Sequence, residues 1–98
     1  MVARLNPQGK MIDFGGIITN GSARLTTEDG ALVITPLPNS PQFELRILWN
    51  SLPWQLKRAQ TVEEMDEAGN VLASYPLQWE GDFAVLTIRP GVFAYRLR

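Results

Sequence analysis

The residues of this chain that could do chemistry are its carboxylates, because the 98 residues include neither histidine nor cysteine. Six of the ten acidic residues gather beside two glycines: Glu63, Glu64, Asp66 and Glu67 precede Gly69, and Glu80 and Asp82 flank Gly81. Glycosidases use two carboxylates that lie about 5–10 Å apart across a cleft. Acidic side chains beside a turn more often bond the backbone of that turn and stay solvated. We therefore predict turn chemistry for these residues and a catalytic role for none of them.

A nucleophilic mechanism has little support in the sequence. The serines are Ser22, Ser40, Ser51 and Ser74. No histidine exists to activate any of them, and a serine–lysine pair would have to use Lys10 or Lys57, which lie in no recognisable motif. The absence of cysteine and histidine also excludes disulfides, thiolate nucleophiles and Cys/His zinc sites. An enzyme in its own right is therefore the least favoured function.

Metal and cofactor motifs are also weak. The stretch "DEAGN" resembles an oxygen-rich calcium loop in which Asp66 and Glu67 could be ligands. It lacks the twelve-residue ligand spacing of an EF-hand. The glycines at 15–16 and 21 belong to no phosphate-binding motif and are typical of a bulge and a turn. We predict no metal site and no cofactor.

The net charge of the chain argues against some classes of binding partner. Nine basic and ten acidic residues give a formal net charge of −1, and no basic run is present, so we predict no nucleic-acid partner. No stretch approaches the ~20 apolar residues of a membrane span, so we predict none. Residues 1–16 carry no apolar run that would suit a secretion signal. Because a chain without cysteine suits a reducing cytosol and secretion equally, the compartment stays open.

Three tryptophans are the best candidates for a binding function, because an indole ring can stack on the apolar C–H face of a sugar. Trp49 continues an apolar strand face and is predicted to lie in the core. Trp54 follows Pro53 in a loop with no alternating pattern to bury it. Trp79 lies beside a turn, where it could cap the end of the fold and pack on Phe83. Trp54 and Trp79 are therefore the predicted carbohydrate-binding residues.

The length and the 45% apolar content predict one globular domain. Residues 1–10 mix Asn, Pro, Gln and Gly with few apolar anchors, and we expect a lead-in or interdomain linker there. The domain itself is predicted at residues 11–98. A further domain is expected to be attached at the N-terminal lead-in.

Short apolar runs alternate with turn signals along the rest of the chain. In "FELRILW", Phe43, Leu45, Ile47 and Trp49 fall on one face of a strand. The prolines at 36, 38 and 41 interrupt strand pairing and predict a loop that crosses between two strands or between two sheets. The segments around Gly15–Gly16 predict either one strand broken by a bulge or two strands joined by a bend. The pair Asn20–Gly21 is a turn signal because both residues tolerate positive φ.

The second half of the chain predicts hairpins. Residues 55–66 are rich in helix formers, but a turn at Gly69–Asn70 favours a hairpin of Leu56–Met65 with Val71–Leu77. In the last strand, Phe93, Tyr95 and Leu97 share a face that we assign to the core, with the Tyr95 hydroxyl bonded to a backbone group at the sheet edge. About seven or eight short strands with turns about every 8–12 residues predict an all-β antiparallel β-sandwich of immunoglobulin-like or Greek-key type. A small closed barrel is the alternative.

The C-terminal third carries a resemblance to a known family. Asp66, Gly69 and Val71 form a D-x-x-G-x-V turn, Gly81–Asp82 follow as a second turn, and the last strand reads "FAYRL". Over residues 62–98 this pattern resembles the small C-terminal β-sandwich domains of bacterial glycoside hydrolases. The pattern consists of turns and apolar strands and contains no catalytic signature.

The resemblance implies a non-catalytic accessory domain of a larger carbohydrate-active enzyme. Such domains pack on the catalytic domain of the same parent chain, stabilise it and sometimes contact carbohydrate. Two alternatives stay open: a carbohydrate-binding module that uses exposed tryptophans, and an immunoglobulin-like protein-interaction domain. Fold-level likeness does not choose among them.

Overall fold

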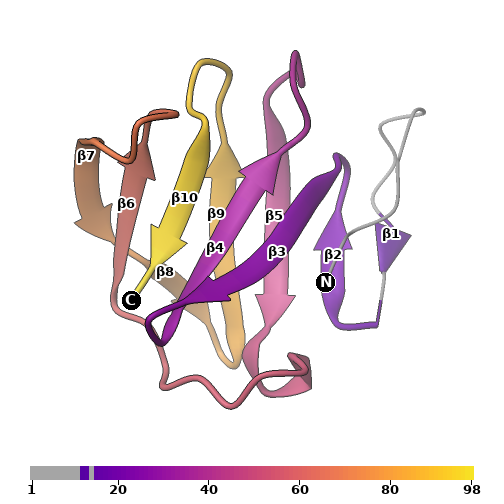
Figure 1. The fold of residues 1–98 in the computed structure, drawn as a ribbon. Helices are drawn as coiled ribbons and strands as arrows, with labels where there is room; N and C mark the ends of the chain where they lie inside the picture. The colour runs from indigo at the N-terminus through magenta and orange to yellow at the C-terminus, as the bar shows by residue number, and fades with distance from the viewer. Residues whose placement is uncertain (1–11, 14) are drawn as a thin grey trace.

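The structure is a computed structural model that describes residues 12–13 and 15–98. The lead-in predicted at residues 1–10 lies outside the described residues, as do Met11 and Phe14. Two antiparallel sheets pack face to face as a compact sandwich (Figure 1). The predicted all-β sandwich class is therefore confirmed, and the sheets do not close into a single barrel. No helix within the described residues is long and apolar enough to cross a membrane.

The first sheet has the strand order β1-β2-β5-β9-β8. Its strands are β1 (Ile12–Asp13), β2 (Ile17–Thr19), β5 (Phe43–Leu48), β9 (Phe83–Ile88) and β8 (Gln78–Glu80). The bend predicted at Gly15–Gly16 separates β1 from β2, and both glycines have positive φ, at 75° and 96°. This bend and the short β8 raise the number of described strands above the seven or eight expected.

The second sheet has the strand order β3-β4-β10-β6-β7. Its strands are β3 (Ala23–Glu28), β4 (Ala31–Pro36), β10 (Ala94–Leu97), β6 (Thr61–Met65) and β7 (Val71–Pro76). The last strand, β10, lies in the middle of the sheet between β4 and β6. In the constant-type immunoglobulin arrangement the last strand lies at a sheet edge, so the strand order here differs from that arrangement.

Alternating apolar side chains from the two sheets form the core between them. In β5, Phe43, Leu45 and Ile47 are buried as predicted, and Trp49 is buried just beyond the strand, in a 3₁₀ turn (Trp49–Ser51). Burying these side chains supplies the main driving force for folding, at about 25 cal/mol per Å² of apolar surface. The proline-rich segment after β4 crosses from the second sheet to the first, as expected.

The predicted hairpin of Leu56–Met65 with Val71–Leu77 is present, but its first strand begins later, at Thr61. The strands β6 and β7 pair antiparallel, with a bulge between Glu64 and Met65, and no helix forms over 55–66. Residues 55–60 form no strand and instead run as an irregular segment along the lower end in Figure 1. Gly69 turns the chain with a φ of 84°, which an L residue adopts only with strain.

The Asn20–Gly21 turn is confirmed, but its physical reason differs from the predicted positive φ. Neither residue has positive φ. The Asn20 side-chain oxygen accepts a hydrogen bond from the backbone N–H of Glu44 at 2.8 Å. A Cβ atom on Gly21 would lie 2.2 Å from the Phe43 ring. Glycine is needed here for close packing of the β2–β3 connection on the core.

Candidate functional sites at the two ends of the sandwich

Three connections meet at one end of the sandwich, which we call the loop end. They are the loop after β4, the turn between β6 and β7, and the turn between β9 and β10, all at the upper end of Figure 1. A groove of about 570 Å³ lies among them. Its lining includes Leu37, Pro38, Asp66, Glu67, Arg89, Val92 and Phe93.

Phe93 was predicted to lie in the core, and this prediction is wrong. Strand β10 begins at Ala94, so Phe93 precedes the strand, and its backbone N–H donates to the carbonyl of Met65 at 3.0 Å. The ring is 46% exposed and lines the groove, where Leu37 is 37% exposed. The groove therefore presents apolar side chains to its surroundings.

Asp66 is a turn residue, as predicted. Its Oδ1 accepts hydrogen bonds from the backbone N–H groups of Ala68 and Asn70 at 3.0 and 2.9 Å, and its Oδ2 accepts one from the Asn70 side chain. The bond from the Asn70 backbone is the main reason that the pKa of Asp66 lies below its ordinary value. Both carboxylate oxygens of Asp66 therefore help to hold the turn.

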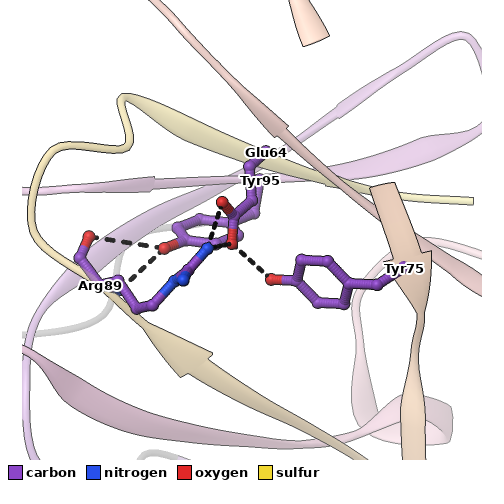
Figure 2. Close-up of polar contacts among 4 residues, drawn as sticks. All are labelled: Glu64, Tyr75, Arg89 and Tyr95. Carbon is purple, nitrogen blue, oxygen red and sulfur yellow. Dashed lines mark hydrogen bonds and ion pairs between the residues drawn. The ribbon is translucent and has the colours of Figure 1, made fainter. Parts of the chain in front are cut away.

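Glu64 was predicted to be a solvated turn residue, and the structure corrects this. Its side chain is only 4% exposed and points between the sheets. The carboxylate accepts hydrogen bonds from the Tyr75 hydroxyl at 2.7 Å and from Arg89 Nη2 at 2.5 and 2.6 Å (Figure 2). A buried carboxylate needs such partners, because an unpaired charge in the interior is strongly unfavourable.

The ionisation of Glu64 follows from two opposing influences. Burial is the largest and would raise the pKa of Glu64, but the hydrogen bonds from Arg89 and Tyr75 and the charge of Arg89 together hold the pKa below its ordinary value. Burial, followed by the bond to Glu64, raises the pKa of Tyr75. Glu64 is therefore ionised and Tyr75 protonated at neutral pH, as an acceptor and a donor must be.

Tyr95 fixes the backbone of Arg89, in the turn between β9 and β10. Its hydroxyl accepts a hydrogen bond from the Arg89 backbone N–H at 2.7 Å and lies 3.5 Å from the Arg89 carbonyl, to which it donates (Figure 2). The predicted bond between this hydroxyl and the backbone is confirmed, but β10 is a central strand, so the expected place at a sheet edge was wrong. Arg89 is held at both its backbone and its guanidinium, so the wall of the groove between β9 and β10 is rigidly placed.

Glu63 faces the other side of the same sheet and is also not a solvated turn residue. Its carboxylate accepts hydrogen bonds from Arg96 Nε at 2.8 Å and Arg98 Nη2 at 3.0 Å. The bond from Arg96 is the largest influence and holds the pKa of Glu63 below its ordinary value, against the effect of burial. Because Arg96 is directly opposite Glu63 in the β10–β6 register, this pair fastens neighbouring strands and opens into no cleft.

The opposite end, which we call the tryptophan end, is closed by aromatic contacts. The rings of Trp49 and Trp79 meet edge to face, with centroids 5.5 Å apart, and Trp79 Nε1 donates to the carbonyl of Ala59 at 3.0 Å. The Arg58 guanidinium lies 3.9 Å from the centroid of the Trp79 ring. Trp79 caps the end as predicted, but its ring contacts are with Trp49 and Arg58.

Trp54 lines a separate hollow of about 610 Å³ at the tryptophan end. The lining residues are Trp49, Asn50, Leu52, Pro53, Trp54, Gln55, Leu56 and Lys57. Trp54 is half-buried and packs against the core cluster. The two tryptophans predicted to bind sugar therefore lie at the same end, but Trp79 does not line the hollow of Trp54.

The buried polar side chains of residues 15–98 are engaged within the fold. Every buried side-chain nitrogen and oxygen from residue 15 onward has a hydrogen-bond partner. No group of three metal-ligating side chains is present in the part of the chain that the structure describes. Glu63 and Glu64 escaped the sequence prediction because their arginine partners are distant in sequence. The available signal was the placement of two consecutive glutamates in a paired strand, where at least one must face the interior.

Comparison of the chain with protein-family models, with curated proteins and with solved structures found no match.

Proposed function

We propose that this domain is a non-catalytic accessory β-sandwich of a larger carbohydrate-active enzyme and packs on the catalytic domain of the same parent chain through its loop end. The observation that carries the proposal is the groove with exposed Leu37 and Phe93. Apolar side chains gathered at one exposed groove are typical of interaction surfaces. The likeness of residues 62–98 to accessory domains of glycoside hydrolases supports the choice of partner.

The rigidity of the groove also supports docking. Arg89 is tied to buried Glu64 and to the Tyr95 hydroxyl, so the turn that carries Phe93 is ordered before any partner arrives. Preorganisation lowers the entropic cost of association. The acidic side chains Asp66 and Glu67 border the same groove, and a polar border around an apolar centre is the usual composition of an interface.

The parent gene provides the first test. We expect the reading frame to continue upstream of the Met1 codon into a catalytic domain. An in-frame stop codon directly upstream, with a start at Met1, would contradict the accessory function.

Binding of the two separated domains provides the second test. The upstream domain would be titrated with this domain by calorimetry, using wild type, Phe93→Ser and Leu72→Ser. Phe93→Ser should weaken binding at least about tenfold, which corresponds to about 1.4 kcal/mol. Leu72 is a matched control, because it is exposed in β7 and does not line the groove. Equal binding by wild type and Phe93→Ser would rule out the loop end as the docking face.

The two alternatives have less support. A carbohydrate-binding platform of Trp54 with Trp79 would need both rings free on one surface, whereas Arg58 covers Trp79. An immunoglobulin-like protein-interaction domain would have its last strand at a sheet edge, whereas β10 is central.

A further inference from the structure

The hollow at the tryptophan end combines one aromatic ring with polar side chains. The Trp54 ring lines it together with the amides of Asn50 and Gln55 and the ammonium group of Lys57. An indole ring offers an apolar surface for the C–H face of a pyranose, and amide groups can both donate to and accept from sugar hydroxyls. This is the usual composition of a small-molecule site, with an apolar wall and a few polar groups.

The backbone that carries these side chains is fixed. The Trp49 indole Nε1 donates to the carbonyl of Leu56 at 3.2 Å, and the Leu52 backbone N–H donates to the carbonyl of Trp49 at 3.3 Å. Leu52 is itself buried in the core. The two ends of the loop are therefore held across the hollow, so a ligand would not have to order the loop when it binds.

The positive charge in the lining of the hollow indicates which class of sugar would bind there. Lys57 is the single charged residue in its lining, and no lining residue is acidic. The neighbouring cation, Arg58, lies over the Trp79 ring at the same end. Its nearest carboxylate, Asp82, is 3.8 Å away, and both side chains are more than half exposed. An exposed ammonium beside a stacking ring favours a sugar that carries a carboxylate, since a charge-assisted hydrogen bond is about twice as strong as a neutral one.

We propose that this hollow binds an acidic sugar of the hexuronate class. The pyranose ring stacks on Trp54, the sugar carboxylate faces Lys57, and the hydroxyls bond the amides of Asn50 and Gln55. This site does not depend on the docking proposed for the loop end, because the two lie at opposite ends of the sandwich (Figure 1). A domain docked through its loop end would leave this hollow facing outward.

Calorimetric titration with short oligomers of galacturonate, glucuronate and mannuronate tests the proposal. The methyl esters of the same oligomers keep the ring and remove the charge. We expect at least one oligouronate to bind with Kd of about 0.1–1 mM, and its ester to bind at least about fivefold more weakly, a difference of about 1 kcal/mol. Failure of all three acids to bind, or equal binding of acid and ester, would overturn the proposal.

Two variants assign the binding to the hollow. Trp54→Ala should weaken binding of the acid and of its ester at least about tenfold. Lys57→Gln, an exposed substitution, should bring the acid down to the affinity of the ester and leave the ester unchanged. Leu72→Ala is the matched control, because it removes an exposed apolar side chain that lines neither proposed site. If Trp54→Ala impairs folding, Lys57→Gln still decides the outcome, since unchanged acid binding in that variant would contradict the site.

Discussion

The two ends of the sandwich are held by different forces, and this difference separates their proposed roles. At the loop end a buried carboxylate, Glu64, fixes a turn through Arg89, and the apolar side chains of Leu37 and Phe93 beside it remain exposed. At the tryptophan end the rings themselves close the fold, with Trp49 against Trp79 and Arg58 over Trp79. Hydrogen bonds to a turn can fix its position and leave the neighbouring apolar side chains exposed. Contacts between rings, in contrast, bury part of each ring, so that part cannot contact a partner.

This difference explains which aromatic residues are available to a partner. The Phe93 ring is 46% exposed, and the turn beneath it is secured by hydrogen bonds instead. Trp79 is engaged by a cation and a neighbouring ring, so it stabilises the fold. Trp54 is intermediate, with part of its ring packed on the core and part lining a hollow. Exposed aromatic surface that the fold does not use is the common feature of both proposed sites.

The largest effect on stability should come from Trp49, where the tryptophan end joins the core. Trp49→Ala removes a large buried ring, the edge contact with Trp79 and the bond to the Leu56 carbonyl. We expect a loss of about 3–5 kcal/mol in the free energy of unfolding, measured by urea denaturation. A loss below about 1 kcal/mol would show that this end is not closed by ring packing.

A smaller loss is expected at the loop end. Glu64→Gln keeps the shape of the side chain and removes the charge that Arg89 and Tyr75 bond. We expect a loss of about 1–2 kcal/mol, because Arg89 is half-exposed and stays solvated without its partner. The same denaturation experiment measures it. A stabilising effect would show that the buried charge opposes folding.

The dependence of stability on pH isolates the contribution of Glu64. The pKa of Glu64 is lower in the folded chain than the ordinary value of 4.5. Glu64 therefore stabilises the folded state fully at a pH above about 4.5, and this stabilisation is lost as the pH falls through the pKa of the folded chain. The gap in stability between wild type and Glu64→Gln should therefore close in acid. Glu63 titrates in the same direction in both proteins, so the comparison removes its effect.

An Arg89→Met variant should reverse that dependence. Without the cation, burial dominates and raises the pKa of Glu64 above its ordinary value. Relative to wild type, the variant should then become less stable as the pH rises through that raised pKa. Denaturation curves measured from acid to neutral pH check the sign. A stability gap that is constant with pH would contradict the assignment of Arg89 as the partner of Glu64.

The smallest effect on stability is expected at Phe93. Its ring is 46% exposed and lies outside the core, so Phe93→Ser should change the free energy of unfolding by no more than about 0.5 kcal/mol. Thermal denaturation of the isolated domain measures it. A loss comparable to that of Trp49→Ala would mean that the ring is part of the core after all.

The fold was predictable where alternation and turn chemistry agree. The buried face of Phe43, Leu45 and Ile47 and the turn at Gly69 follow from side-chain period and backbone preference. The alternation of apolar and polar residues placed Phe93 wrongly in the core. That pattern does not show that strand β10 begins one residue later, at Ala94.

The candidate sites were less predictable because they depend on contacts between distant segments. Glu64 meets Arg89 across 25 residues, and no local pattern reports that pairing. Trp54 was found from its loop position, whereas the polar side chains around it became visible only when the loop was folded. The sequence shows which residues are aromatic, but only the folded structure shows which aromatic rings are exposed.

Oxidative footprinting with mass spectrometry tests the central claim most directly, because it compares side-chain exposure at both ends in one experiment. The isolated domain and the proposed parent enzyme would be oxidised by hydroxyl radicals under the same conditions. We predict that Phe93 and Leu37 are modified in the isolated domain and protected in the parent, while Trp54 is modified equally in both. Equal modification of Phe93 in the two proteins, or protection of Trp54 in the parent, would contradict docking through the loop end.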